Sequence, residues 1–444
     1  MTATISQQSL PLPPGNLGLP LIGETFNFLY DPHYVEKRQK QYGSIFKTSL
    51  FGYPTVMAIG AEANRHLFAN EKSHLSVGWP ESLKVLLGKK SLVIQTGNEH
   101  QNRRKIFNKA FQPKILEQSV SAIEGISHSY LDKWERMGTF SWFPELSKYS
   151  LDVACKVLVD VDTSDDSHFS KYFEEWGDGL FSIPIRLPWT KFGRALHSRK
   201  QLLLRIEEIV RKRQQQSHTN QDLLGLLLQV QDEDGNKLSL EEVKDQILTF
   251  LFGGHDTIGS ALTAMCMLLA QSPEVLATAR AEQQQMGLEK PLTLEHLKQM
   301  NYLEQVVKEV LRVTPSATFG FRKVIKEFEF NGYRIPQNWI AVYVIRRTHQ
   351  DSSIYTQPEL FDPQRFAPER AEDKAKPFGY VPFGGGMREC PGKEFGKLVI
   401  KLLTAMLLRE YEWELEAEQN LNPVLFPTPY PRDGLRVNFR RLAS

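Results

Sequence analysis

The sequence predicts a mainly α-helical protein with a smaller β-rich lobe. Helical periodicity fills residues 115–160 and 163–213, and one further helical pattern runs from 239 to 271. Alternating, strand-like segments occur mainly in two short regions near residues 45–59 and 320–344. We therefore expect one domain over residues 1–444, with a β-rich lobe from 45–75 and 318–365 and a helical lobe from the remainder.

Composition limits the classes of function. The chain has 444 residues, 41% of them hydrophobic, and a net charge of +2 that argues against a general nucleic-acid binder. Cys155 and Cys266 lie in apolar helical surroundings and are interpreted as core thiols, so no disulfide framework is predicted. Neither a signal peptide nor a run of roughly 18 uncharged apolar residues is visible. We expect a soluble, cytoplasmic protein without a membrane span.

The N-terminal part begins with a turn-rich, proline-containing stretch over residues 10–20. A helix, a β-hairpin and a second short helix are then predicted, at 32–42, 45–59 and 61–70, followed by a mixed connection over 73–95. The next helix opens at Gly97 and contains His100 and Arg104, which share one face because they are four residues apart. A solvated basic face is the simplest interpretation of that pair.

The longest predicted helix is the best candidate for a buried spine. Ser239 and Glu242 form a capping box at its start, and Pro273 follows its end at Gln271. A helix of about 32 residues would be roughly 48 Å long. The Gly-Gly-His-Asp-Thr sequence at 253–257 interrupts its middle with small residues beside a hydroxyl, which marks a site for a kink or for close helix packing.

The C-terminal third alternates helices and strands. Helices are predicted at 273–286, 293–300 and 301–313, and a polar segment at 214–222 is predicted to be a mobile loop. Glu309 and Arg312 are spaced i, i+3, the spacing of a surface ion pair. An Asn-Gly turn within 328–344 predicts a hairpin, and strand-like pieces follow Tyr411.

The stretch from Phe383 to Gly392, Phe-Gly-Gly-Gly-Met-Arg-Glu-Cys-Pro-Gly, carries the strongest chemical signal. Cys390 precedes the N-terminus of a predicted helix, where the positive dipole end favours a thiolate. The glycines allow close approach of the backbone to a flat group, and Arg388 could bind a carboxylate of that group. A lone cysteine is more often a reactive or core thiol, but the complete spacing favours ligation of haem iron.

This stretch resembles the haem-binding signature of the cytochrome P-450 superfamily at its Phe, Gly, Arg, Cys and Gly positions. The resemblance implies haem b between the long central helix and the cysteine-loop helix, with Cys390 as the axial thiolate and Phe383 in the signature. It also implies that His100, Arg104, Arg322 and Arg388 face the haem propionates. Asp256 and Thr257 would deliver protons to bound O2, and Glu309, Arg312 and Arg365 would form a structural network without chemistry.

A closer resemblance is to the retinoic-acid-hydroxylating branch of that superfamily. It rests on residues 76–88, 180–185, 252–257, 320–322 and 382–395. The implied substrate pocket is long, narrow and apolar, and four aromatic side chains are predicted to line it: Trp79, Phe181, Phe252 and Phe321. Such a pocket suits a rigid isoprenoid acid, because a rigid ligand loses little entropy on binding. Plain core packing is the alternative for each ring.

The resulting hypothesis is a monooxygenase that uses O2 and two electrons from a separate ferredoxin- or flavodoxin-type protein. A basic stripe for this partner is predicted from Lys393, Lys397 and Lys401, with Arg103, Lys105 and Lys109 beside it, and a solvated face is the alternative. Two other functions stay open. One is a haem-thiolate peroxygenase or isomerase, whose members tend to lose the Asp-Thr pair that is intact in this sequence. The other is a haem-based sensor without turnover, which would usually carry an output domain.

Overall fold

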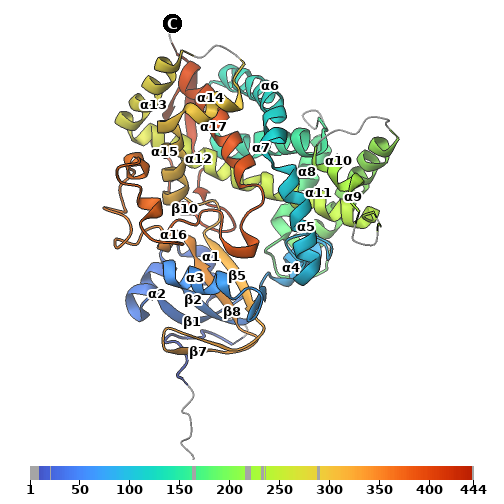
Figure 1. The fold of residues 1–444 in the computed structure, drawn as a ribbon, viewed down its shortest axis with the longest axis vertical. Coiled ribbons are helices and arrows are strands. Elements are labelled where there is room, and N and C mark those ends of the chain that lie inside the picture. Colours follow the sequence, from blue (N-terminus) through green and yellow to red (C-terminus); the bar gives the residue numbers. More distant parts are fainter. Residues whose placement is uncertain are drawn as a thin grey trace, which may run out of the picture.

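The computed structural model describes residues 10–20, 22–162, 167–215, 222–231, 235, 237–287 and 291–442. Most of the loop predicted at 214–222 lies outside the described residues. The helical part and the main sheet occupy opposite ends of the molecule in Figure 1.

The main sheet has five strands in the order β1-β2-β8-β5-β3. Their bounds are Ile45–Leu50 (β1), Tyr53–Ala58 (β2), Leu75–Val77 (β3), Phe319–Val324 (β5) and Ile340–Val344 (β8). β2 and β8 are parallel, and the other neighbours are antiparallel. The predicted hairpin over 45–59 is confirmed by the register of β1 on β2.

Both faces of this sheet are buried. Along β8, Ala341 and Tyr343 belong to one apolar cluster, while Ile340 and Val342 belong to another on the opposite face. Successive side chains of a strand point to opposite faces, so a central strand covered on both sides is apolar at every position. β5, next to β8, uses the same alternation to direct Phe321 and Arg322 to different faces.

Three smaller sheets complete the β structure. They are β4 (Thr139–Ser141) with β12 (Arg436–Arg441) and β9 (Tyr411–Leu415), β6 (Phe328–Phe330) with β7 (Tyr333–Ile335), and β10 (Pro423–Val424) with β11 (Tyr430–Pro431). The hairpin of β6 and β7 turns at Asn331 and Gly332, whose φ values are both positive. The Asn-Gly turn predicted a hairpin here, and the structure confirms it.

Helices make up most of the remaining regular structure of the described chain (Figure 1). Before the spine they are α1 (Thr25–Tyr30), α2 (Tyr34–Tyr42), α3 (Ala61–Ala69), α4 (Glu81–Leu87), α5 (Gly97–Ala110), α6 (Pro113–Met137), α7 (Trp142–Val159), α8 (Ser167–Gly179), α9 (Lys191–Gln214) and α10 (Leu223–Gln229). After it come α13 (Pro273–Met286), α14 (Leu294–Gln299), α15 (Asn301–Val313), α16 (Ile345–Thr348) and α17 (Lys393–Glu410), with 3-10 turns η1 (Pro363–Phe366), η2 (Glu372–Lys374) and η3 (Gly386–Arg388).

The spine is two helices rather than the single helix predicted for 239–271. α11 (Leu240–Gly254) begins at the predicted Ser239 capping box, and α12 (Asp256–Gln271) continues after a break at His255. His255 has φ −81° and ψ −93°, which leave the helical region. The break falls within the small-residue segment 253–257, which the sequence marked as a site for a kink or for close helix packing.

The spine crosses the cysteine-loop helix α17 near its N-terminus. A Cβ on Gly254 would lie 3.9 Å from the ring of Phe395 on α17 and 3.0 Å from Ala154 on α7. In the part of the chain that the structure describes, no single helix is both long and apolar enough to cross a membrane; only the bent pair of Leu240–Gln271 with Pro273–Met286 meets the length and composition test. The close crossing places Cys390 near the middle of the spine.

Candidate active site

The loop that carries Cys390 is folded tightly against α3. The Cys390 N–H donates to the Phe383 carbonyl oxygen at 2.9 Å, which closes the loop. Gly386 has a φ of +68°, a conformation that side chains other than glycine rarely adopt. A Cβ on Gly385 would lie 2.5 Å from the ring of Phe68. These two glycines therefore let the loop pack closely against α3, and they also permit close approach to a flat ligand.

The electrostatic surroundings of Cys390 shift the pKa of its thiol. Burial raises the pKa of its thiol, and this effect outweighs the N–H of Gly392 and the positive charge of Arg104, which both lower it. The net shift of the pKa is therefore upward. A metal ion deprotonates a coordinating thiol outright, so ligation itself would supply the ionisation.

Four predicted basic side chains converge beside this loop from three elements. His100 and Arg104 come from α5, Arg322 from β5 and Arg388 from η3. Burial, followed by the charges of Arg388, Arg104 and Arg322, lowers the pKa of His100 to about 4. Burial and the neighbouring arginines likewise lower the pKa of Arg388 to about 10. The four groups thus form one concentrated, largely buried region of positive charge.

Contacts among the described residues leave part of this region open for an anionic ligand. Arg322 Nη2 and Nε donate to Glu71 Oε1 at 2.5 and 2.8 Å, and Arg388 Nη2 donates to the Gln95 carbonyl oxygen at 2.7 Å. His100 Nδ1 and Gln95 Oε1 are buried without a hydrogen-bond partner among the described residues. Haem b, with two carboxylates and one metal position for a thiol, matches this set of groups.

Glu71 is a site residue that sequence reasoning missed. Its side chain is 2% exposed, and its Oε2 accepts the N–H of Met387 in the cysteine loop at 2.9 Å. Since Oε1 binds Arg322, this one carboxylate joins β5 to the cysteine loop. In the sequence it sits in a polar Asn-Glu-Lys turn after a helix, a pattern typical of a solvated position. No local signal distinguishes it.

Across the site, the spine presents an open face at Gly253 and Thr257. Gly253 is exposed although Gly254 beside it is buried, and a Cβ on Gly253 would meet no atom within 4 Å. The Thr257 hydroxyl, four residues on, donates to the Gly253 carbonyl oxygen at 2.5 Å. The Thr257 carbonyl oxygen in turn accepts from Ser316 at 2.8 Å. This hydroxyl therefore lies on the open face of the broken helix.

Asp256 has different neighbours. Its Oδ1 lies 2.9 Å from Nδ1 of His255, the residue at the break. Burial raises the pKa of Asp256. The charge of His255 and hydrogen bonds from His255 and Ser147 lower the pKa by more than burial raises it, so the net shift is downward. The carboxylate is therefore ionised at neutral pH. Asp256 and Thr257 are adjacent in sequence, but these contacts are to different groups.

Three of the four predicted pocket aromatics are joined through Phe426 and Phe321. Phe181 lies against Phe426, with ring centroids 4.7 Å apart, and Phe321 lies 6.5 Å from Phe426. Trp79 lies 5.8 Å from Phe321. Phe426 was missed, because it belongs to a proline-punctuated tail whose path across the molecule no local pattern reveals. Phe252 lies elsewhere, packed edge-on against Trp176 at 5.7 Å.

The predicted structural network is present and fully buried. Glu309 receives Arg312 Nε and Nη2 at 2.7 and 2.8 Å and Arg365 Nε at 3.0 Å. His349, which the sequence analysis missed, connects this network to the cysteine loop. Its Nδ1 lies 3.2 Å from the Arg312 carbonyl oxygen, and its Nε2 accepts the N–H of Val381 at 2.9 Å. Burial is the main cause that lowers the pKa of His349 to about 3, so the ring is neutral.

The predicted basic stripe on α17 is largely neutralised. Lys397 and Lys401 both bind Glu304, at 2.9 and 3.1 Å, and Lys401 is buried. Lys393 lies 3.1 Å from Glu389. The lysines are spaced four residues apart on the helix, as predicted, but the spacing could not show that a carboxylate from α15 lies between two of them. Three lysines on one helix face therefore do not form one free positive surface.

Comparisons with known proteins agree on one family. The model of the family described as cytochrome P450 matches residues 13–429. A putative cytochrome P450 120 from Synechocystis is 43% identical over 442 residues and covers 100% of both chains. Cytochrome P450 26A1 from Gallus gallus is 35% identical over 97% of this chain and 90% of its own. A solved structure titled as retinoic-acid-bound cyanobacterial CYP120A1 superposes with a TM-score of 0.95, at 43% identity, over 98% of this chain and 100% of that one.

Proposed function

Because this chain belongs to the cytochrome P450 family, and is therefore a haem-thiolate monooxygenase, we propose that it hydroxylates a long, apolar isoprenoid acid, with retinoic acid as the first candidate. The observation that carries the choice of substrate is the aromatic cluster in which Phe181 and Phe321 contact Phe426 and Trp79 contacts Phe321. The retinoic acid bound in the similar cyanobacterial structure supports the same choice.

The residues that would hold haem b are those that converge beside the cysteine loop. Cys390 would ligate the haem iron, and His100, Arg104, Arg322 and Arg388 would bind the two propionates. When bound, the haem supplies the activation of O2 that C–H hydroxylation requires. The protein positions the substrate, excludes water and delivers protons.

Proton delivery is proposed to use the open face of the spine. The Thr257 hydroxyl donates its one proton to the Gly253 carbonyl oxygen, so its lone pairs can accept a hydrogen bond from a water on this face and hold that water as the proton donor. Asp256, ionised and bound to His255, would hold the break of the helix in place and draw protons toward it. An intact pair of this kind favours a monooxygenase that consumes protons over a peroxide-dependent isomerase.

Ligand titration tests the substrate class directly. We expect all-trans-retinoic acid to shift the ferric spin state at micromolar concentration, because the substrate displaces the water ligand. Phe181→Ala should weaken that binding by roughly 1–3 kcal/mol, since apolar contact between the ring and the substrate is lost. A response to steroids or short terpenes with none to retinoids would contradict the substrate class and leave the monooxygenase.

Cofactor ligation has its own test. The reduced protein with carbon monoxide should give the absorption band for which this family is named, and Cys390→Ser should abolish it. Retention of the band in the serine variant would contradict the assignment of Cys390.

Electrons are proposed to come from a separate ferredoxin- or flavodoxin-type protein.

A further inference from the structure

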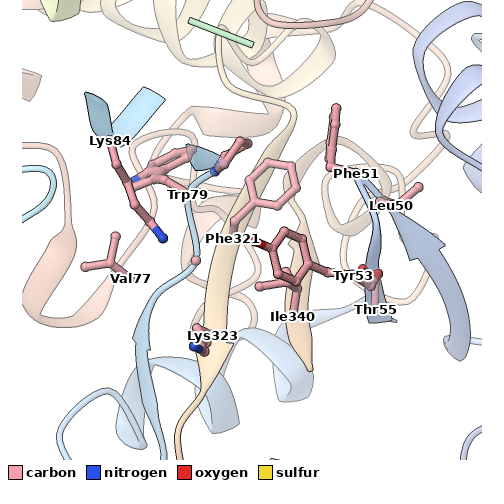
Figure 2. A pocket seen from close by; sticks show the side chains of 12 residues that line it. Leu50, Phe51, Tyr53, Thr55, Val77, Trp79, Lys84, Phe321, Lys323 and Ile340 are labelled. Carbon is pink, nitrogen blue, oxygen red and sulfur yellow. Dashed lines mark hydrogen bonds between the residues drawn. The ribbon is translucent and has the colours of Figure 1, made fainter. Parts of the chain in front are cut away.

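A small pocket opens between the main sheet and α4, next to the aromatic cluster. Trp79 and Lys84 line it on one side of Phe321, and Tyr53 lies on the other side, as Figure 2 shows. Its volume of about 50 Å³ is far below the several hundred Å³ that a whole drug-sized ligand needs. It can therefore take one end of an elongated molecule, but not the molecule itself.

The charge of this pocket has one sign. Lys84 and Lys323 are its two ionised groups, and none of the described residues that line it is acidic. Its apolar walls come from side chains such as Trp79, Phe321 and Ile340. Ammonium groups beside aromatic and aliphatic walls suit the carboxylate end of an apolar acid, because the charge is paired while the adjoining carbons are buried.

One stretch of chain, residues 316–321, runs from the open face of the spine to this pocket. Ser316 donates to the Thr257 carbonyl oxygen, and the chain then enters β5 and reaches Phe321 five residues later. Five residues span at most about 18 Å. Phe426 lies along this stretch, since the carbonyl oxygen of Leu425 accepts from Thr318 at 3.2 Å and the Phe426 ring approaches Phe321. An elongated substrate could lie along it.

We propose that this pocket binds the carboxylate of the substrate and that Lys84 is the residue that pairs with it, an inference that rests on the proposed isoprenoid-acid hydroxylation. Lys84 is the better of the two lysines, because its side chain is 36% exposed while Lys323 is an exposed residue of β5. Its own acidic neighbour, Glu81, is 60% exposed and 3.7 Å away, beyond hydrogen-bond length.

The position of Lys84 is also fixed by its surroundings. Ser82, on the same helix, donates to the Leu180 carbonyl oxygen at 2.7 Å, which ties α4 to the end of α8. Before the helix, Gly78 runs so close to β5 that a Cβ would lie 2.6 Å from the carbonyl carbon of Arg322. Lys84 therefore extends from a short helix that is held by the hydrogen bond of Ser82 and by the close packing of Gly78 on β5.

Binding of an acid and of its neutral analogue separates this proposal from the proposed function. Dissociation constants for all-trans-retinoic acid and for retinol are measured from the ferric spin-state shift, for wild type, Lys84→Met, Lys323→Met and the control Lys89→Met, an exposed lysine just beyond α4. We expect Lys84→Met to weaken the acid about tenfold and retinol less than about twofold, with little effect at Lys89. The carbon monoxide band verifies that each variant is folded.

Two results would overturn the role of Lys84. One is equal weakening of acid and alcohol by Lys84→Met, which would make the residue structural; the other is an unchanged affinity for the acid. A wild-type protein that responds to neither retinoid would instead contradict the proposed substrate. The same variants are then titrated with a C20 fatty acid and its alcohol, and the same loss of preference for the acid is expected.

Discussion

The hydroxyl of Thr257 combines a structural and a chemical role in one side chain. Its hydrogen bond to Gly253 spans the break at His255, from the first turn of α12 to the end of α11. Threonine is a weaker helix former than alanine, so the stability of the helix does not require it. The residue is therefore explained better by its open position than by helix formation.

Thr257→Ala should consequently separate chemistry from folding. We expect the free energy of unfolding to change by less than about 0.5 kcal/mol, because alanine compensates for the lost hydrogen bond by its helix propensity. Substrate binding should persist, while a larger share of the reducing equivalents ends in peroxide or water. Product and peroxide per reductant consumed are the measurements. Thr257→Ser, which keeps the hydroxyl, should retain coupling, and unchanged coupling in the alanine variant would contradict the role.

His349 makes a prediction about pH at the same scale. The Val381 N–H must be accepted by Nε2, so Nδ1 carries the proton and donates to the Arg312 carbonyl oxygen. The pKa is about 3 in the folded protein against an ordinary value of 6.5. The unfolded chain therefore takes up a proton below pH 6.5 while the folded protein does not. As the pH falls from about 6 to about 3, this one residue should lower the free energy of unfolding by about 1.4 kcal/mol for each pH unit.

The check compares wild type with His349→Gln by urea unfolding at pH 7 and pH 5. Glutamine can accept from Val381 but does not titrate, so the difference in stability between the two proteins should shrink as the pH falls. His100, whose pKa is also lowered, is present in both proteins and cancels in the comparison. A difference that stays constant with pH would show that His349 is not neutral in the folded protein.

At the scale of elements, what could be predicted followed from local pattern. The Ser239 capping box and the Asn-Gly hairpin depend on residues a few positions apart, and the structure confirms both. The Glu309–Arg312 pair also forms, but it is fully buried and not the surface ion pair that its spacing alone indicated. The break at His255 was predicted only as a place for a kink, because periodicity alone cannot decide between a bend and two helices. Local sequence pattern thus predicted the helices and strands better than the junctions between them.

The site was predictable to the extent that it is contained in motifs. The convergence of His100 and Arg388 followed from a family signature, but Glu71 did not, because its partners are 251 and 316 residues away in sequence. The contact of Phe181 with Phe426 is non-local in the same way. Long-range pairing is a property of the folded chain, and no spacing in the sequence reveals it.

Glu71 therefore provides a test of how the elements are joined. Glu71→Gln keeps an acceptor for the Met387 N–H but leaves the buried Arg322 without a counter-charge, which should lower the free energy of unfolding of the haem-free protein by about 3 kcal/mol. Glu62→Gln on α3 is the control: its ion pair with Arg65 is exposed, so its loss should cost less than about 1 kcal/mol. Urea unfolding gives both values, and equal losses would contradict the role assigned to Glu71.

At the scale of the whole molecule, the partner surface is set by which charges are already paired. The chain carries 54 basic and 52 acidic residues, so a docking surface must come from local separation of charge and not from net charge. Glu304 removes Lys397 and Lys401 from the predicted stripe, and Arg103 binds Glu242 at 2.8 Å. Lys105 and Lys109, on α5, are exposed.

Two charge reversals should therefore behave differently. Phe111, just after α5, lies 6.1 Å from Phe395 of α17, so the end of α5 packs beside the start of the cysteine-loop helix, where an acidic electron carrier is proposed to bind. Lys105→Glu should slow electron transfer from a ferredoxin and weaken its dependence on salt, with unchanged stability, since attraction between exposed charges is screened by ions. Lys397→Glu should instead lower the free energy of unfolding by about 1–2 kcal/mol, because it places a third carboxylate beside Glu304 and Glu394. Stopped-flow reduction at several salt concentrations and urea unfolding separate the two effects, and a Lys105 variant with wild-type reduction kinetics at every salt concentration would remove α5 from the docking surface.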